Sequence, residues 1–183
     1  ISLTPRLIAL SLLAALRAAP SLSRAGLDEG LAAYDKADYA TALKELAPLA
    51  EKGDAQAQYR LGRMFNLGQG LQTNKAEAAK WFHLAAEQGL PEAQVALGYL
   101  CLVGEGVSQN SELALEWTRK AAEQGDANAQ YNLGVMHGET YGIKKDPAES
   151  LKWMRKAAEQ GHGEALNALG ALYRHGAGGV KED

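Results

Sequence analysis

The sequence is poor in cysteine and has no large excess of charge of either sign. Its one cysteine, Cys101, has no partner in the chain for a disulfide and excludes a metal site built from several cysteines. The formal net charge is −3 over 183 residues, without the basic stripe that favours nucleic acid as a partner. With 46% hydrophobic and 22% charged residues, the composition is that of an ordinary globular protein.

Motifs of common catalytic and cofactor sites are also missing. The sequence contains no nucleophile elbow, phosphate loop or dinucleotide fingerprint, and no two histidines have the four-residue spacing of a helical metal site. His137 and Cys101 occupy the same position of neighbouring repeats. Such positions are roughly 10 Å apart, too far to ligate one metal ion together. We therefore expect no enzymatic activity, cofactor or metal site.

The first 25 residues contain no acid and three arginines, which are Arg6, Arg17 and Arg24. The apolar run between the first two would span only about 15 Å as a helix, which is too short to cross a bilayer. A basic start, a short apolar core and small residues at 23 and 25 are typical of a secretory signal peptide. We predict that residues 1–25 are a signal peptide and that the protein is periplasmic or secreted. The alternative is an apolar helix packed on the rest of a cytoplasmic protein.

The pentapeptide AAEQG ends at Gly89, Gly125 and Gly161, and so recurs every 36 residues. Tryptophan recurs with the same period at Trp81, Trp117 and Trp153. A fixed period of this length marks an array of stacked supersecondary units. Residues 26–39 are predicted as an N-terminal capping helix, and four units follow at 40–75, 76–111, 112–147 and 148–183.

Each unit is predicted to form two helices. The first begins after an N-cap side chain, at Asp38, Asn74, Asn110 and Asp146, and ends at the AAEQG glycine, which suits a left-handed residue. The second helix carries a glycine at one fixed position: Gly62, Gly98, Gly134 and Gly170. Glycine costs about 1 kcal/mol relative to alanine inside a helix. We therefore predict that it allows close approach of the first helix of its own unit, through Ala50, Ala86, Ala122 and Ala158.

The repeat consensus, A-x-x-W-x-x-K-A-A-E-Q-G-x-x-x-A-Q-x-x-L-G-x-M-x-x-x-G-x-G-V, is similar to that of the Sel-one-like repeat family, which is related to tetratricopeptide repeats. The resemblance covers residues 40–183. It implies an all-α, right-handed α-solenoid of antiparallel helix pairs, and a role as a scaffold or adaptor for protein complexes, often in bacterial envelopes. Members with a cysteine pair in each repeat have been linked to β-lactam binding or hydrolysis, which the single cysteine here does not favour.

Exposed positions that differ between units are the predicted partner-binding surface. In related solenoids the first helices line a concave groove, and here their outward positions are mostly basic in the third and fourth units. The candidate residues are Lys44, Lys80, His83, Glu116, Arg119, Lys120, Lys152, Arg155 and Lys156. We predict a non-enzymatic scaffold that binds a protein or peptide there. The alternatives are a factor that binds envelope polysaccharide or cell wall, and a β-lactamase-like hydrolase.

The last predicted helix, at about residues 163–174, has no following helix in the sequence. Its apolar residues are therefore expected to be uncovered and to offer a second docking face, formed by Leu166, Leu169, Leu172 and Tyr173.

Overall fold

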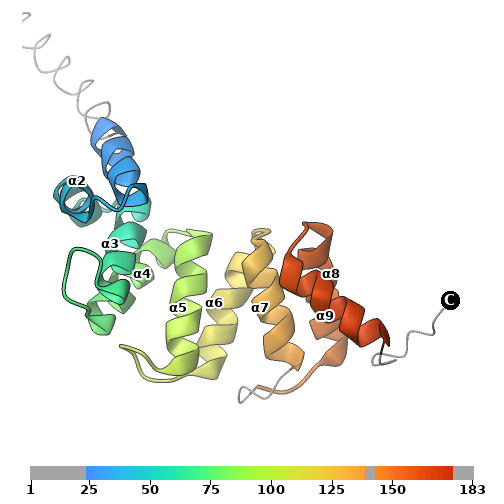
Figure 1. Cartoon of the computed structure of the whole chain (residues 1–183). Coiled ribbons are helices and arrows are strands. Elements are labelled where there is room, and N and C mark those ends of the chain that lie inside the picture. Colours follow the sequence, from blue (N-terminus) through green and yellow to red (C-terminus); the bar gives the residue numbers. More distant parts are fainter. Residues whose placement is uncertain (1–23, 139–142, 175–183) are drawn as a thin grey trace, which may run out of the picture.

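The computed structural model describes residues 24–138 and 143–174, and these ranges contain helices and loops without a strand. A helix over residues 24–35 precedes α2 (Tyr39–Glu51), α3 (Ala55–Leu67), α4 (Lys75–Glu87), α5 (Pro91–Val103), α6 (Ser111–Glu123), α7 (Ala127–Gly138), α8 (Pro147–Glu159) and α9 (Gly163–Arg174). Figure 1 shows them along an extended array, with α8 and α9 at the end opposite the helix of residues 24–35. The fold is the all-α solenoid that the repeat predicts. Residues 1–23, most of the predicted signal peptide, lie outside the described ranges.

Alternate helices form two rows. His83 of α4 meets Trp117 of α6 edge to face, with ring centroids 5.9 Å apart. Val95 of α5 and Val135 of α7 likewise line one pocket. We call α2, α4, α6 and α8 the even row, and α3, α5, α7 and α9 the odd row. The core lies between the rows and is built largely of small and medium apolar side chains, among them Ala42, Leu46, Ala93, Leu97, Ala129 and Leu133.

The helix boundaries follow from capping residues, as predicted. The side chains of Asp38, Asn74, Asn110 and Asp146 accept hydrogen bonds from first-turn amides of the even-row helices. After these helices, Gly53, Gly89, Gly125 and Gly161 have φ of +97°, +88°, +94° and +83°. A Cβ on any of the four would meet nothing within 4 Å. The backbone conformation, rather than lack of space, therefore requires glycine there.

The glycines inside α3, α5 and α7 each contact the even-row helix that follows. A Cβ on Gly62 would lie 2.7 Å from the ring of Phe82, and one on Gly98 would lie 2.8 Å from Thr118 Oγ1. The same atom on Gly134 would lie 2.7 Å from Met154 Cγ. The predicted facing residues, Ala50, Ala86, Ala122 and Ala158, are therefore wrong. Those alanines lie on the preceding helix, whereas the tight contact is with the following helix.

A buried glutamine and an exposed glutamine together join three consecutive helices, and they do so at three places in the array. Gln94 of α5 donates a hydrogen bond from Nε2 to the carbonyl oxygen of Ala86 in the last turn of α4, at 3.2 Å. Its Oε1 accepts a hydrogen bond from Nε2 of Gln124, the C-cap of α6, at 2.8 Å. The same two bonds recur one repeat earlier, through Gln58 and Gln88, and one repeat later, through Gln130 and Gln160. The glutamine of AAEQG is thus an inter-repeat tie, which we call the glutamine relay.

The apolar residues of α9 differ in exposure. Leu166 is 51% exposed and Leu172 is half-buried, but Leu169 is only 8% exposed. The prediction that Leu169 belongs to an uncovered docking face is therefore wrong. It occupies the repeat position of Leu61, Leu97 and Leu133, which all face the core. The side chain of Tyr173 lies outside the described part of the chain.

The glycine contact predicts a position-dependent effect of one substitution. Gly134→Val is expected to lower the free energy of unfolding by about 1–3 kcal/mol, because its side chain would overlap Met154 and the Ser150 carbonyl oxygen. Gly170→Val is the matched control, since a Cβ on Gly170 would meet nothing within 4 Å. Urea unfolding measured by circular dichroism compares the two. Equal losses of stability would contradict the close contact.

The glutamine relay predicts a second effect on stability. Gln94→Leu keeps the size of the side chain but leaves the Ala86 carbonyl and the Gln124 amide without this partner. We expect a loss of about 0.5–1.5 kcal/mol for each hydrogen bond removed, because the Ala86 carbonyl keeps its backbone partners and the Gln124 side chain is exposed. Gln109→Leu is the control, because the Gln109 amide makes an exposed bond to the Leu102 carbonyl. Thermal unfolding of both variants measures the difference, and an unchanged melting temperature for Gln94→Leu would refute the role of the relay.

Candidate functional site

All nine residues predicted to bind a partner lie on the even row, and all are exposed. They come from α2, α4, α6 and α8, at the positions Lys44, Lys80, His83, Glu116, Arg119, Lys120, Lys152, Arg155 and Lys156. The fold thus brings them together on one row of helices.

Neighbouring carboxylates accompany many of these charges. Lys120 lies 2.7 Å from Glu116, and Lys152 lies 2.7 Å from Glu149, as the helical spacing predicts. Lys44, Lys80 and His83 are within 4 Å of Glu45, Glu77 and Glu87. Exposed pairs of this kind contribute little to stability, because water screens them, and they weaken further with salt. The even row is therefore a surface of mixed charge rather than a purely basic patch.

Lysines of the even row also cover the repeated tryptophans. The Lys120 ammonium lies 4.1 Å from the centroid of the Trp117 ring, and that of Lys156 lies 4.3 Å from the centroid of Trp153. Both tryptophans are buried. The contact is a cation–π attraction that holds each lysine against its helix. These two rings therefore act as supports for lysines and are not open platforms for stacking a sugar.

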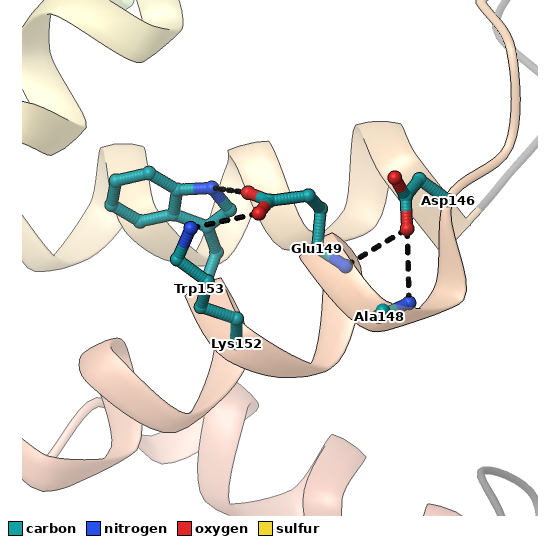
Figure 2. Close-up of polar contacts among 5 residues, drawn as sticks. All are labelled: Asp146, Ala148, Glu149, Lys152 and Trp153. Carbon is teal, nitrogen blue, oxygen red and sulfur yellow. Dashed lines mark hydrogen bonds and ion pairs between the residues drawn. The ribbon is translucent and has the colours of Figure 1, made fainter.

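The start of α8 shows how one such lysine is positioned. Figure 2 shows the Asp146 carboxylate accepting hydrogen bonds from the amides of Ala148 and Glu149. The Glu149 carboxylate accepts from Trp153 Nε1 at 2.9 Å and from Lys152 Nζ at 2.7 Å. The bond from Lys152 is the main reason that the pKa of Glu149 is below its ordinary value, and the bond from Trp153 adds to it. Lys152 also lines a hollow of about 570 Å³ at the start of α8, together with Arg155.

The odd row has a different character, because it carries few charges. The even-row helices α2, α4, α6 and α8 contain three, four, five and five Asp, Glu, Lys or Arg residues. The odd-row helices α3, α5, α7 and α9 contain two, one, none and two. Large exposed apolar residues of the odd row include Tyr99, Val103, Leu67 and Leu166. Low charge and exposed apolar area are properties of the centre of a protein interface.

A pocket of about 210 Å³ opens between α5 and α7 in the odd row. Gly98 and Thr118 line it, together with apolar side chains that include Val95, Val135 and Met136. Sequence reasoning missed these residues. The available signal was Thr118, which occupies the repeat position of the larger Phe82 and Met154.

Two arginines of α3 lie against one tyrosine of the helix over residues 24–35. The guanidinium carbons of Arg60 and Arg63 are 5.0 and 5.6 Å from the centroid of the Tyr34 ring. Burial raises the pKa of Tyr34, and the two guanidinium charges oppose that shift. The Tyr34 hydroxyl donates a hydrogen bond to Gln69 Oε1 at 2.7 Å. The cluster therefore fixes two cations on the odd row, one repeat before the pocket.

Cys101 and His137 are both buried, in line with the packing role of their repeat position. Burial raises the pKa of the Cys101 thiol, which keeps it protonated at neutral pH. Within residues 24–138 and 143–174, no three His, Cys, Asp or Glu side chains are placed to hold a metal ion. Of the helices in these same ranges, none combines the length and the apolarity that a bilayer crossing requires.

The α8 cluster predicts a change in one titration. Lys152→Met is expected to raise the pKa of Glu149 toward the ordinary value of about 4.3, because the Lys152 hydrogen bond is the largest cause of its depression. Side-chain carboxyl ¹³C shifts followed by NMR against pH measure it. Lys156→Met is the control, since Lys156 contacts the Trp153 ring but is not a cause of the Glu149 shift. The same change in both variants would show that Lys152 has no specific role.

The profile of the Sel1 repeat matches residues 55–90, 91–126, 127–162 and 163–183. The period is the predicted 36 residues, but each matched repeat begins with an odd-row helix. By the division used for the family, α3, α5, α7 and α9 are therefore the first helices of their repeats. A search of curated proteins finds no match.

Two solved structures are similar to this chain. A Sel1 repeat protein from Oxalobacter formigenes is 36% identical, with a TM-score of 0.78, and the match covers 85% of this chain and 63% of that protein. The protein c5321, a protective antigen present in uropathogenic Escherichia coli strains and displaying an SLR fold, is 31% identical, with a TM-score of 0.77. That match covers 88% of this chain and 35% of c5321. This chain thus spans less than two thirds of either protein. The matched repeats account for most of its residues, and the chain belongs to the Sel1 repeat family.

Proposed function

We propose that this protein is a non-enzymatic scaffold or adaptor that binds a protein or peptide partner. The observation that carries the proposal is that the contacts between helices repeat along the array, whereas the exposed side chains vary. The glutamine relay recurs in successive repeats, whereas exposed positions of the same helices differ between repeats. A rigid frame holds the varied side chains in place before binding, so that less conformational entropy is lost when the partner binds. Sel1 repeats generally mediate protein interactions, which supports this function.

We further propose that the even row contacts the partner through its exposed charges. Arg119 and Arg155 occupy the same position of successive repeats, on α6 and α8. Charges at an exposed rim mainly accelerate association and orient the partner. An acidic segment of the partner would complement these two arginines.

A location in the bacterial envelope is part of the proposal. Its support is the composition of residues 1–25, together with the similarity to c5321, which is described as a protective antigen. Mass spectrometry of the protein isolated from its own cells tests it. A mature N-terminus near Gly26 is the expected result, and a retained N-terminal segment with cytosolic partners would reverse the assignment.

Catalysis is the main alternative that a simple assay can examine. The proposal expects no hydrolysis of nitrocefin by the purified, metal-free chain. Turnover under those conditions would overturn the non-enzymatic assignment and favour the β-lactamase-like reading. Binding of envelope polysaccharide has less support, because the Trp117 and Trp153 rings are buried under lysines.

Charge reversal of the even row tests the proposed surface. Arg119→Glu combined with Arg155→Glu is expected to leave the melting temperature unchanged, because both residues are exposed. The affinity for the native partner, isolated by affinity purification and measured by surface plasmon resonance, should fall by about tenfold, equivalent to about 1.4 kcal/mol. Leu84→Ser, at another exposed site of the even row, is the control. Unchanged affinity of the double variant would remove these arginines from the binding surface.

A further inference from the structure

The pocket between α5 and α7 exists because one repeat has a small residue where its neighbours have large ones. Phe82 packs against Gly62, and Met154 packs against Gly134. Thr118 is the corresponding side chain opposite Gly98, and it reaches the pocket without filling it. The helices therefore pack in the same way at these three glycines, but only the middle contact, at Gly98, has a threonine in place of a larger side chain.

The size of the pocket suits one side chain of a partner. Its volume of about 210 Å³ is below the range of about 300–1,000 Å³ that is usual for small-molecule sites. Tyr99 on its rim is 58% exposed, and Val103, one turn further along α5, is 41% exposed. A large apolar side chain inserted here would be surrounded by apolar contacts, as are the anchor residues that dominate the energetics of protein interfaces.

A polar group at the pocket suits a peptide backbone. The side chain of Asn132 lines the pocket and has no hydrogen-bond partner within the part of the chain that the structure describes. An amide can both donate and accept, and so can pair with the N–H and C=O groups of an extended segment.

The charge of the odd row indicates what lies beside the anchor. Arg63 occupies the repeat position of Tyr99 one unit earlier, and Arg60 lies one turn from it and contacts the same Tyr34 ring. Neither guanidinium has a carboxylate within 4 Å among the described residues. The one acidic residue of α5 is Glu92, which lies in the first turn of the helix, whereas Tyr99 lies in its second half. Between α3 and the pocket, the described surface therefore carries two guanidinium groups that no nearby carboxylate neutralises.

We propose that the odd row from α3 to α7 binds an extended, acidic segment of a partner protein, with one large apolar side chain in the α5–α7 pocket. The inference rests on the proposed scaffold function and names the chemistry of the partner. The distance from Arg63 to the pocket is about one to one and a half repeat steps, or roughly 10–15 Å. An extended chain covers about 3.3 Å per residue. The acid therefore lies three to five residues from the apolar anchor, on the side toward α3.

Selection from a random peptide library tests this chemistry without knowledge of the native partner. The full chain is immobilised and used to select from phage-displayed 12-residue peptides. The expected peptides carry Leu, Phe, Met or Trp with Asp or Glu three to five residues away. Fluorescent synthetic copies then give affinities by anisotropy, and replacing the apolar residue by Ala or the acid by Lys should weaken binding at least tenfold.

Variants of the protein connect these peptides to the pocket. Thr118→Phe places in α6 the residue that α4 has at the same position, so the fold can hold it and the pocket is filled. It should reduce peptide affinity at least tenfold with no loss of melting temperature, whereas Thr118→Ser, which stays small, should bind as the parent does. Arg63→Glu should weaken binding of the acidic peptide and restore binding of the peptide in which the acid is replaced by Lys. The even-row variant with Arg119→Glu and Arg155→Glu should bind these peptides normally.

The outcomes separate this inference from the proposed function. Selected peptides without the apolar and acidic pattern, equal affinity for Thr118→Phe and the parent, or no enriched peptide at all would overturn the odd-row site. The scaffold function would survive such a result if the native partner still binds through Arg119 and Arg155. Failure of the chain to bind any protein from its own cells would overturn the scaffold function itself.

Discussion

The hydrogen bonds of the buried glutamines Gln58, Gln94 and Gln130 set the geometry on which the array depends. Gln94 pairs with the end of α4 through a carbonyl and with the end of α6 through an amide, and so fixes three helices at one point. A buried amide is costly unless it is paired, so only one relative placement of the three helices satisfies it. Repeating the same pair along the chain repeats the same placement, and the regular stack follows.

The contacts that hold the helices together leave the exposed positions free to vary, and these positions differ in charge between the two rows. On the even row, lysines lie along buried tryptophans, as Lys120 does on Trp117, and acids neutralise part of their charge. On the odd row, α7 has no Asp, Glu, Lys or Arg residue and shares a pocket with α5. One row is thus suited to solvent and to long-range attraction, and the other is suited to close apolar contact.

The caps and ends of the helices could be predicted from the sequence. The contacts of one helix with the next helix, and the pocket that depends on them, could not. A cap such as Asp146 and a helix end such as Gly89 involve only a few neighbouring residues, so the residue types alone are enough to predict them. The sequence analysis assigned the contacts of the internal glycines to the wrong helix. The sequence shows that a small residue is required at this position, but it does not show which helix packs against it. The predicted lysines and arginines are exposed and lie on one row of helices, and their role in binding stays a prediction. The pocket was missed, because it depends on the contrast between Thr118 and its counterparts in other repeats.

The hydrogen bonds of the glutamine relay are made by groups that do not ionise. A glutamine amide keeps the same donors and acceptors across the pH range in which carboxylates and imidazoles change charge, and its buried bonds are little affected by dissolved ions. Acid or salt therefore acts on exposed pairs such as Glu149 with Lys152 and leaves the relay unchanged. The attraction that we propose for a charged partner would vary with the medium, while the helices that the relay joins keep their placement.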